Sequence, residues 1–424
     1  MRRRGPPIVP SSWDYQPTFR ERHGNNRGGV IMGAFELLCR LVNLLWSALC
    51  GILSSVFGGG STSGSGRTVA FDDGRSVVVG RQIAEGGFSF VFEARDAGGG
   101  GGGRGGGGRR LYALKRINCG DEDIVEQCRK EAGVHRTFDH PNLMSLLGMK
   151  FESSSPNASS SSGRRSRGSA ETCYMLFPYM PHSLREDINR RRLLDDDVAS
   201  ESHRRPYSER EALTLFAGVV DAIRTMHDAD LSHRDVKVEN ILLGDEGGTV
   251  RTKGRGVKTP VLMDFGSAGP SSVPLRARSN VLRITEEAAQ HTTLPYRAPE
   301  LFDGGVRHGP DVALDYGRAD VWSLGCLLFA LMYGSSPFEI EWRADGTVRI
   351  VDCTHLKVLG PVPFPPSGSP ADGRYGEEAK DLVRWMLNQA RGERPTSEDV
   401  AERVGRLLGA DAGGGSSRKK KGAV

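Results

Sequence analysis

Apolar and polar residues alternate along the first half of the chain in the manner of β-strands, starting at Thr68. The alternating runs, separated by turn residues or longer polar stretches, lie at 68–71, 76–84, 88–94, 111–117 and 173–177. Beyond Arg210 the period becomes that of amphipathic helices, as in 212–223 and 321–332. The pattern predicts an α+β domain in which strands come first and helices second.

An apolar segment at 33–57 stands apart from this domain. Placed on a helix, the segment has one narrow polar stripe, formed by Glu36, Arg40, Asn43, Ser47, Gly51 and Ser54. Its uncharged run, 41–57, is at the lower limit of length for crossing a bilayer, so spanning the membrane and lying in the interface both stay open. We expect an apolar anchor helix within 32–57, with a signal peptide or a helix packed on the domain as alternatives.

Composition separates folded from flexible parts of the chain. Glycine accounts for 56 of 424 residues, so part of the sequence must be flexible filler around a folded region. We expect a disordered basic leader at 1–31, a Gly/Ser linker at 58–67 and a basic disordered tail at 409–424. The folded domain then extends over 68–408, with inserts at 97–110, 153–170 and 244–259.

Charge and cysteine content exclude some classes of protein. The net charge of +5 is small for this length and gives no case for a nucleic-acid partner. Basic residues gather locally, in the leader, in the insert 244–259 and at 418–421. We expect the insert to be a solvated loop, with recruitment of an acidic surface as the alternative. A short charged tail is usually solvated; of the two functions that its charge suggests, nuclear import and contact with anionic lipid, the anchor segment favours lipid contact. The seven cysteines are odd in number and form no CxxC pair, which fits a reducing compartment rather than a disulfide framework or a zinc site.

Two motifs in the strand region have the composition of a nucleotide site. The turn between the second and third expected strands is small and glycine-rich, so its backbone N–H groups can close over phosphates. The candidate residues of this turn are Ala84, Glu85, Gly86, Gly87, Phe88 and Val91. In the next strand, Lys115 follows Ala113, and a lysine there can reach both phosphates and a helix glutamate, for which Glu131 in the helical stretch 124–138 is the candidate.

The strongest chemical signal is His233-Arg-Asp-Val-Lys-Val-Glu-Asn240 followed by Met263-Asp-Phe-Gly266. In this arrangement Asp235 accepts the proton of a substrate hydroxyl and Lys237 neutralises a phosphoryl group in transfer. Asn240 and Asp264 supply oxygen ligands that hold Mg²⁺ between the phosphates of ATP. The motifs therefore predict phosphoryl transfer with ATP and Mg²⁺.

With Tyr296-Arg-Ala-Pro-Glu300, Asp320-Val-Trp-Ser-Leu-Gly325 and Arg394-Pro395, these motifs make residues 68–408 resemble a protein kinase domain. The resemblance implies a two-lobed fold, with a β-rich N-lobe, an α-helical C-lobe and ATP bound between them. It also implies that Glu300 pairs with Arg394 and that Asp320 braces the catalytic loop. The hinge is expected at Phe177, Tyr179 and Met180, and Lys237 is typical of serine/threonine kinases.

Finer details resemble the Numb-associated kinases. These are Ser89 in the phosphate loop, Asp264-Phe-Gly-Ser267, the turn His140-Pro-Asn142, Leu262-Met-Asp264, and a helix-like insertion at 286–296. The sequence is similar in particular to a small member of that family whose N-terminus carries myristoyl and palmitoyl groups and which is associated with Golgi and other membranes. Ala84 departs from the usual glycine of the phosphate loop, and its β-carbon limits local backbone freedom.

The resemblance implies a location at the cytoplasmic face of a membrane, where ATP is available. The arginines that precede 41–57 would keep the N-terminus in the cytosol and send a spanning chain to the lumen, so we favour an anchor that lies in the membrane plane or inserts as a hairpin. Cys39 and Cys50 border the polar stripe, where acylation could reach them. A start at Met32 would also expose Gly33 as a candidate for myristoylation, although Leu37 occupies the usual Ser/Thr position.

Regulation and two rival functions stay open at this level. Arg234 beside the base suggests control by phosphorylation near Thr292 and Thr293, whereas Thr293 also stands where kinases use a threonine to contact the catalytic loop. We expect transfer to serine and threonine residues of proteins and of the kinase itself. The rivals are a scaffold without catalysis and a small-molecule or lipid kinase, but the intact motifs favour a protein kinase.

Overall fold

A computed structural model describes residues 66–85, 89–98, 110–153, 171–193, 207–244, 258–275, 278–302 and 313–413 of the chain. All of them belong to one compact unit that begins at Gly66. The leader, the anchor at 32–57, nearly all of the linker and the tail beyond Gly413 lie outside the described residues. Among the helices that are described, none has the length and apolar character needed to cross a membrane.

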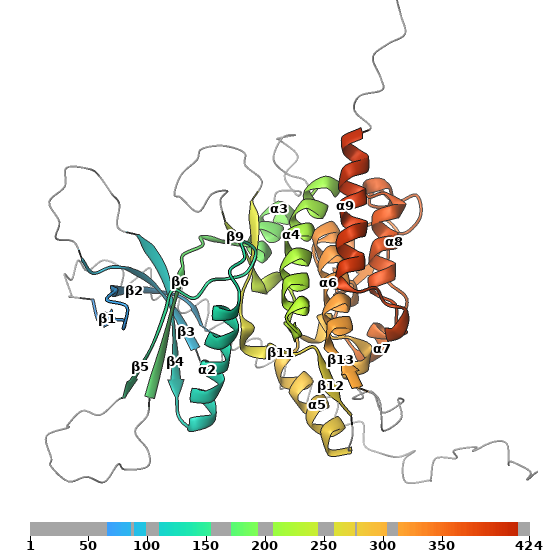
Figure 1. Ribbon diagram of the computed structural model, residues 1–424. Coiled ribbons are helices and arrows are strands. Elements are labelled where there is room, and N and C mark those ends of the chain that lie inside the picture. Colours follow the sequence, from blue (N-terminus) through green and yellow to red (C-terminus); the bar gives the residue numbers. More distant parts are fainter. Residues whose placement is uncertain are drawn as a thin grey trace, which may run out of the picture. The chain divides into compact units, whose positions relative to one another are not determined.

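The N-lobe, residues 66–178, is built on one antiparallel sheet with the strand order β1-β2-β3-β4-β6-β5 (Figure 1). Its strands are β1 (Thr68–Ala70), β2 (Ser76–Glu85), β3 (Ser89–Asp96), β4 (Leu111–Cys119), β5 (Gly148–Ser153) and β6 (Glu171–Pro178). Helix α2 (Glu122–Thr137) packs against one face, and its first turn is capped by the Asp121 side chain, which accepts from the Ile124 N–H. All five expected strands and the expected helix are thus present within a few residues of their predicted ends.

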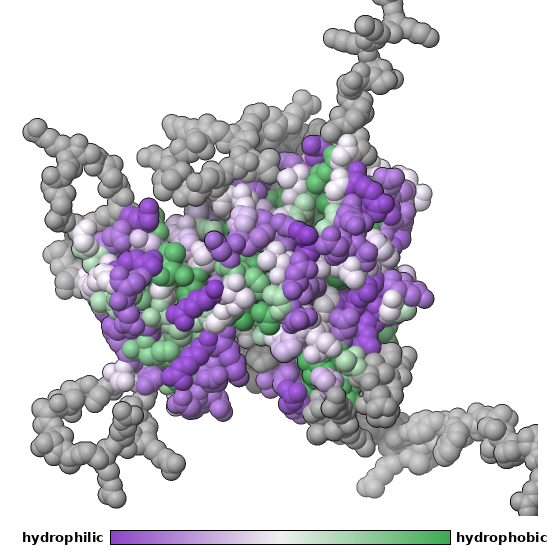
Figure 2. Space-filling model, viewed as in Figure 1, coloured by the Kyte–Doolittle hydropathy of each residue, from purple (hydrophilic) through white to green (hydrophobic). Residues whose placement is uncertain are grey.

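The C-lobe, residues 182–413, is mainly helical. Its helices are α3 (Leu184–Leu193), α4 (Glu209–Asp228), α5 (Arg278–His291), α6 (Tyr316–Tyr333), α7 (His355–Val358), α8 (Glu377–Met386) and α9 (Ser397–Gly413). Nearly every residue of α6 is buried, as its continuous apolar sequence requires; α4 and α8 pack against it, and α9 packs on α4 and α8. In the view of Figure 2, hydrophilic residues predominate over α8 and α9. Helix α9 continues to Gly413, past the domain end expected at 408.

Short strands and 3-10 turns of the C-lobe shape the segments that carry the motifs. The strands are β7 (His182–Ser183), β8 (Leu231–Ser232), β9 (Ile241–Gly244), β10 (Thr259–Leu262), β11 (Gly269–Pro270), β12 (Ser272–Pro274), β13 (Ala313–Asp315), β14 (Ile340–Trp342) and β15 (Val348–Ile350). The turns are η1 (Val238–Asn240), η2 (Phe265–Ser267), η3 (Leu294–Tyr296), η4 (Pro299–Leu301), η5 (Pro337–Glu339), η6 (Asp372–Arg374) and η7 (Arg391–Glu393). Pairing of β8 with β11 and of β9 with both β7 and β10 fixes the loops between them.

Each expected insert connects two antiparallel strands that are neighbours in a sheet. The glycine run joins β3 to β4, the second insert joins β5 to β6, and the third joins β9 to β10. Three insert boundaries need correction, because Ser153, Gly244 and Thr259 pair within strands, whereas the expected end at 170 agrees with the start of β6 at Glu171. The inserts therefore lengthen hairpin turns and leave the sheets themselves continuous.

Candidate active site

The catalytic loop that follows β8 is held by a buried carboxylate of α6. Asp320 Oδ1 accepts from the Arg234 N–H at 2.8 Å, and Oδ2 accepts from the His233 N–H at 2.8 Å. His227 Nε2, at the end of α4, lies 3.0 Å from the same Oδ2. Arg234 has φ +70°, a left-handed conformation that non-glycine residues rarely adopt, so these hydrogen bonds hold a strained turn in place. Asp320 thus has the bracing position that its motif implies.

Asp235 lies directly after this turn and is surrounded by three of the residues that the motifs point to. Lys237 Nζ is 2.7 Å from Asp235 Oδ2, and Asn240 Nδ2 donates to the same oxygen at 3.1 Å. On the other side, the hydroxyl and the N–H of Thr293 donate to Oδ1 at 2.9 and 3.1 Å. Lys237 Nζ also donates to the Thr293 hydroxyl at 2.7 Å. The carboxylate is therefore buried, held from both sides and placed beside a positive charge, as a base for a substrate hydroxyl requires.

A second charged group links the two lobes. Lys115 Nζ of β4 lies 2.7 Å from Glu131 Oε1 of α2 and 3.7 Å from Asp264 Oδ1 at the start of η2. Burial alone would lower the pKa of Lys115, but attraction to Glu131 and Asp264 outweighs it and the pKa rises. Burial would raise the pKa of the Asp264 carboxyl, but Lys115, His233 and Lys237 outweigh this effect and the pKa is lowered. Both groups are therefore charged at neutral pH, ready to bind phosphate and metal respectively.

Asn240 and Asp264 fit a magnesium ion by the chemistry of their donors. Asn240 directs its Nδ2 to Asp235, which leaves Oδ1 as the side-chain atom able to bind a metal, and Asp264 offers an ionised carboxylate. Within the described residues there is no cluster of three or more His, Cys, Asp or Glu side chains that could hold a metal ion by itself. Mg²⁺ in such sites takes one or two protein oxygens and completes its shell with substrate phosphates and water. The residues present therefore match a metal that is bound together with the nucleotide.

The remaining nucleotide candidates lie on inner strands of the sheet and at the hinge. Ala84 pairs with Val91 between β2 and β3, Glu85 follows Ala84, and Ala113 pairs with Phe177 between β4 and β6. Gly86, Gly87 and Phe88 lie outside the described residues. Tyr179 and Met180 directly follow β6 and are partly buried. The structure thus brings Ala113, Lys115, Glu131, Phe177, Met180 and Asp264 to the junction of the lobes.

Two residues near this junction were not singled out by the sequence. Leu242 of β9 is partly buried and packs on the same N-lobe cluster as Ala113 and Met180. It therefore offers the planar adenine ring of ATP an apolar surface on the C-lobe side. Ile241, Leu242 and Leu243 are all apolar, so the sequence itself holds no alternation that would have identified Leu242. His135 of α2 is buried near Glu131, and no pattern in the sequence distinguishes it from other helix residues.

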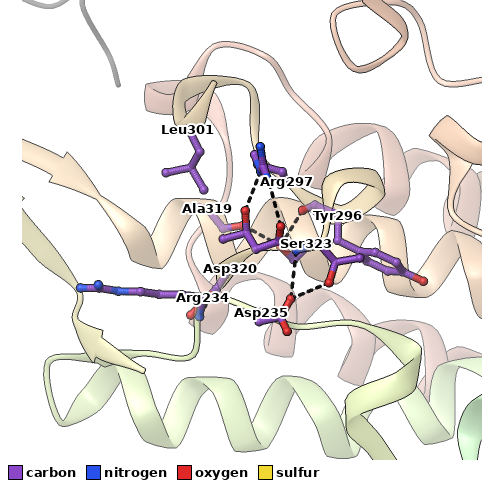
Figure 3. Close-up of a pocket in the computed structure, with 10 residues that line it drawn as sticks. Arg234, Asp235, Tyr296, Arg297, Leu301, Ala319, Asp320 and Ser323 are labelled. Atoms are coloured by element: carbon purple, nitrogen blue, oxygen red, sulfur yellow. Dashed lines mark hydrogen bonds between the residues drawn. The ribbon is translucent and has the colours of Figure 1, made fainter. Parts of the chain in front are cut away.

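The stretch 292–302, which follows α5, lines one side of the site. Figure 3 shows Asp235 facing this segment, with the Arg234 side chain directed away from it. The Arg234 guanidinium lies 3.9 Å from the centre of the Tyr316 ring and donates to the Pro270 carbonyl at 2.7 Å. A β-carbon on Gly269 would come within 2.7 Å of this guanidinium, so a larger residue there would require the Arg234 side chain to move. Of the two threonines considered for regulation, Thr293 contacts the catalytic loop, as one of the two alternatives predicted.

Glu300 and Arg394 form the ion pair that the resemblance implies. The guanidinium donates to both carboxylate oxygens, at 2.8 and 3.1 Å, and both side chains are buried. Arg394 also lies over the Trp322 ring of α6 and donates to the Arg318 carbonyl. The two hydrogen bonds of this ion pair, together with the contacts of Arg394 to Trp322 and Arg318, offset the free-energy cost of removing both charges from water. It anchors the segment that carries Thr293 to the C-lobe core.

Comparison with known proteins agrees with this geometry. The family model described as "Protein kinase domain" matches residues 77–404. Serine/threonine-protein kinase 16 of mouse and of human are each 29% identical to this chain over 331 residues, covering 77% of this chain and 88% of theirs. A probable serine/threonine-protein kinase of Dictyostelium discoideum is 27% identical over 391 residues, covering 79% of this chain and 95% of its own length. Together with the site around Asp235, these findings show that the chain belongs to the protein kinase domain family and is a serine/threonine protein kinase.

Proposed function

We propose that this kinase transfers the γ-phosphate of ATP to serine and threonine hydroxyls of proteins and of itself, at the cytosolic face of a membrane. The observation that supports the transfer most directly is the pairing of Asp235 with Lys237 and Thr293. One carboxylate oxygen is engaged by the threonine and the other faces the lysine, so the base and the neutralising charge are already in place before a substrate arrives.

Each residue of the site has a separate role in the proposed reaction. Asp235 accepts the proton of the substrate hydroxyl as the hydroxyl oxygen attacks the γ-phosphorus, and the bond from that phosphorus to the ADP oxygen breaks. Lys237 lies beside Asp235 and offsets the negative charge of the phosphoryl group during transfer. Lys115, oriented by Glu131, holds the phosphates from the N-lobe side. Mg²⁺, when bound by Asn240 and Asp264, neutralises phosphate charge.

Incubation with MgATP and phosphosite mapping by mass spectrometry test the autophosphorylation. We expect phosphoserine or phosphothreonine on the wild-type chain and none on Asp235→Asn, which keeps the shape of the side chain but removes the base. Mixing the two proteins distinguishes the routes, because phosphate on the Asp235→Asn chain requires transfer between molecules. A wild type that stays unmodified while it phosphorylates other proteins would refute self-phosphorylation without refuting the kinase.

Attachment to a membrane is the part of the proposal that rests on the sequence. The segment 32–57 is apolar with a polar stripe, and Cys39 and Cys50 at the stripe border are candidate acylation sites. Membership of the Numb-associated family is supported by α5, a helix within the segment between Asp264 and Glu300, where the sequence predicted an insertion. A Golgi or other endomembrane location follows from the same resemblance.

Cell fractionation tests the anchor. The full chain should sediment with membranes, and deletion of 32–57 should move it to the soluble fraction. Replacement of Cys39 and Cys50 by serine distinguishes acylation from simple apolar insertion, because a hydrophobic segment alone would still bind after the change. An unchanged membrane fraction after the deletion would refute the anchor.

A further inference from the structure

Three thiols gather between α2 and the sheet of the N-lobe. Cys128 belongs to the face of α2 that is buried, Cys119 ends β4, and Cys173 lies near the start of β6. All three side chains are buried and belong to one apolar cluster. The three cysteines are free, and the proposed phosphate transfer uses none of them.

The contacts among these thiols centre on Cys128. Side-chain hydrogen bonds connect Cys128 to Cys173 and to Cys119. Cys173 pairs with Ile117 across β6 and β4, and Cys119 lies two residues after Ile117, so the two strand cysteines lie on the same face of the sheet. Cys128 of the helix therefore has a candidate disulfide partner on each of two neighbouring strands.

The surroundings of Cys128 favour ionisation of this thiol over that of its neighbours. Hydrogen bonds to Cys173 and Cys119 and the charge of Lys115 lower the pKa of Cys128, although burial and Glu131 oppose the shift. The hydrogen bond to Cys128 and burial raise the pKa of Cys173, and burial is the main reason that the pKa of Cys119 rises to about 11. Because the thiolate is the form that attacks an oxidant, Cys128 is the nucleophile of the cluster.

Cys173 is the better placed of the two partners. Cys119 Sγ is engaged with the backbone of both strands, because it lies 3.7 Å from the Ile117 carbonyl oxygen and forms a hydrogen bond with the backbone of Cys173. A bond from Cys128 to Cys119 would give up these contacts, whereas the hydrogen bond of the Cys173 thiol is already made to Cys128.

We propose that Cys128 reacts with hydrogen peroxide and then forms a reversible disulfide with Cys173, which ties α2 to β6. The Cys128 thiolate attacks one peroxide oxygen, the O–O bond breaks, and the products are a sulfenic acid and a hydroxide that takes up a proton to become water. The Cys173 sulfur then attacks the Cys128 sulfur, and the sulfenic oxygen leaves as a second water. The two electrons that reduce the peroxide come from the two sulfurs.

The burial of the cluster limits which oxidants can reach it. Entry requires a local opening of the contact between α2 and the sheet, so a molecule as small as hydrogen peroxide reaches Cys128 more readily than a bulky thiol reagent does. We expect peroxide to oxidise Cys128 in the folded chain under conditions in which a maleimide leaves it unlabelled. Labelling of Cys128 by the maleimide as fast as that of the partly buried Cys353 would contradict this restriction.

Peptide mapping by mass spectrometry of the full chain after peroxide treatment tests the bond. We expect a Cys128–Cys173 disulfide in the wild type, its loss on addition of dithiothreitol, and the same disulfide in the matched control Cys119→Ala. In Cys173→Ala, Cys128 should instead accumulate as sulfinic acid, because no thiol resolves the sulfenic acid. A disulfide from Cys128 to Cys119 in the wild type, or oxidation of Cys353 while Cys128 stays a thiol, would overturn the proposal.

The melting temperature provides a second readout. A disulfide that closes the chain from 128 to 173 restricts the unfolded state, so peroxide should raise the Tm of the wild type and of Cys119→Ala by about 5 °C. Cys173→Ala should show no such rise, and an equal change in Cys173→Ala and the wild type would overturn the proposal. Neither measurement uses kinase activity, so an inactive enzyme with the expected disulfide would refute the proposed function and leave this inference intact.

Discussion

Thr293 lies against the Asp235 carboxylate although 58 residues separate the two in the chain. Its hydroxyl donates to Asp235 and accepts from Lys237, so one small side chain connects base and lysine. The sequence predicted Asp235, Lys237 and Asn240 because they stand within one short motif. It left the role of Thr293 open, because a contact between distant segments depends on how α5 and η3 are placed.

Replacement of Thr293 tests this connection. We expect Thr293→Ala to lower kcat about tenfold, since two hydrogen bonds around the base are lost, and Thr293→Ser to stay within a few-fold of wild type. Steady-state kinetics with a generic protein substrate is the measurement. If Thr293→Ala and Thr293→Ser were equally impaired, the hydroxyl would not be the group that matters, because serine keeps it.

Elements of secondary structure were predicted best where the period is long and regular. The strands of the N-lobe and helices α2, α4 and α6 lie where the hydrophobic pattern placed them. The insertion expected at 286–296 is α5, but the helix spans Arg278–His291. It begins earlier because Ile284 and Ala288 already face the core, and it ends before Pro295, whose ring disfavours helix at the preceding residue.

The Glu300–Arg394 pair links two elements and can be tested by stability. Arg394→Met leaves Glu300 buried without its partner, so we expect the free energy of unfolding to fall by about 3–5 kcal/mol. The matched control is Arg349→Met, which removes an exposed pair with Glu341 between β14 and β15 and should change stability by less than about 1 kcal/mol. Urea unfolding monitored by tryptophan fluorescence compares them. Similar losses in the two variants would mean that the buried pair contributes no more than a surface pair.

At the scale of the whole molecule, the reacting groups come from both lobes. Lys115 and Glu131 belong to the N-lobe, and Asp235, Asn240 and Asp264 belong to the C-lobe. The order of strands and helices predicted this division. The sheet order could not be predicted, because β6 pairs with both β4 and β5 and no local pattern in the sequence fixes such pairing.

Shortening the third insert tests whether it serves only as a hairpin turn. Gly244 pairs directly with Thr259, so replacing 245–258 by Asn-Gly should close the hairpin with a two-residue turn. The change removes Lys258, but its partner Asp187 keeps Tyr207 and Arg191. We expect kcat and melting temperature close to wild type. A raised KM for one class of protein substrate would instead show that the basic insert recruits it.

The most direct test of the account is transfer of labelled phosphate from MgATP to a generic protein substrate, with Asp235→Asn as the control and phosphoamino-acid analysis of the product. The geometry around Asp235 predicts phosphoserine and phosphothreonine with the wild type. In the control, transfer should fall by at least about 100-fold, because the base that accepts the hydroxyl proton is missing. Equal transfer by both proteins, or no transfer by either while ATP still binds, would contradict the proposed catalytic role of Asp235.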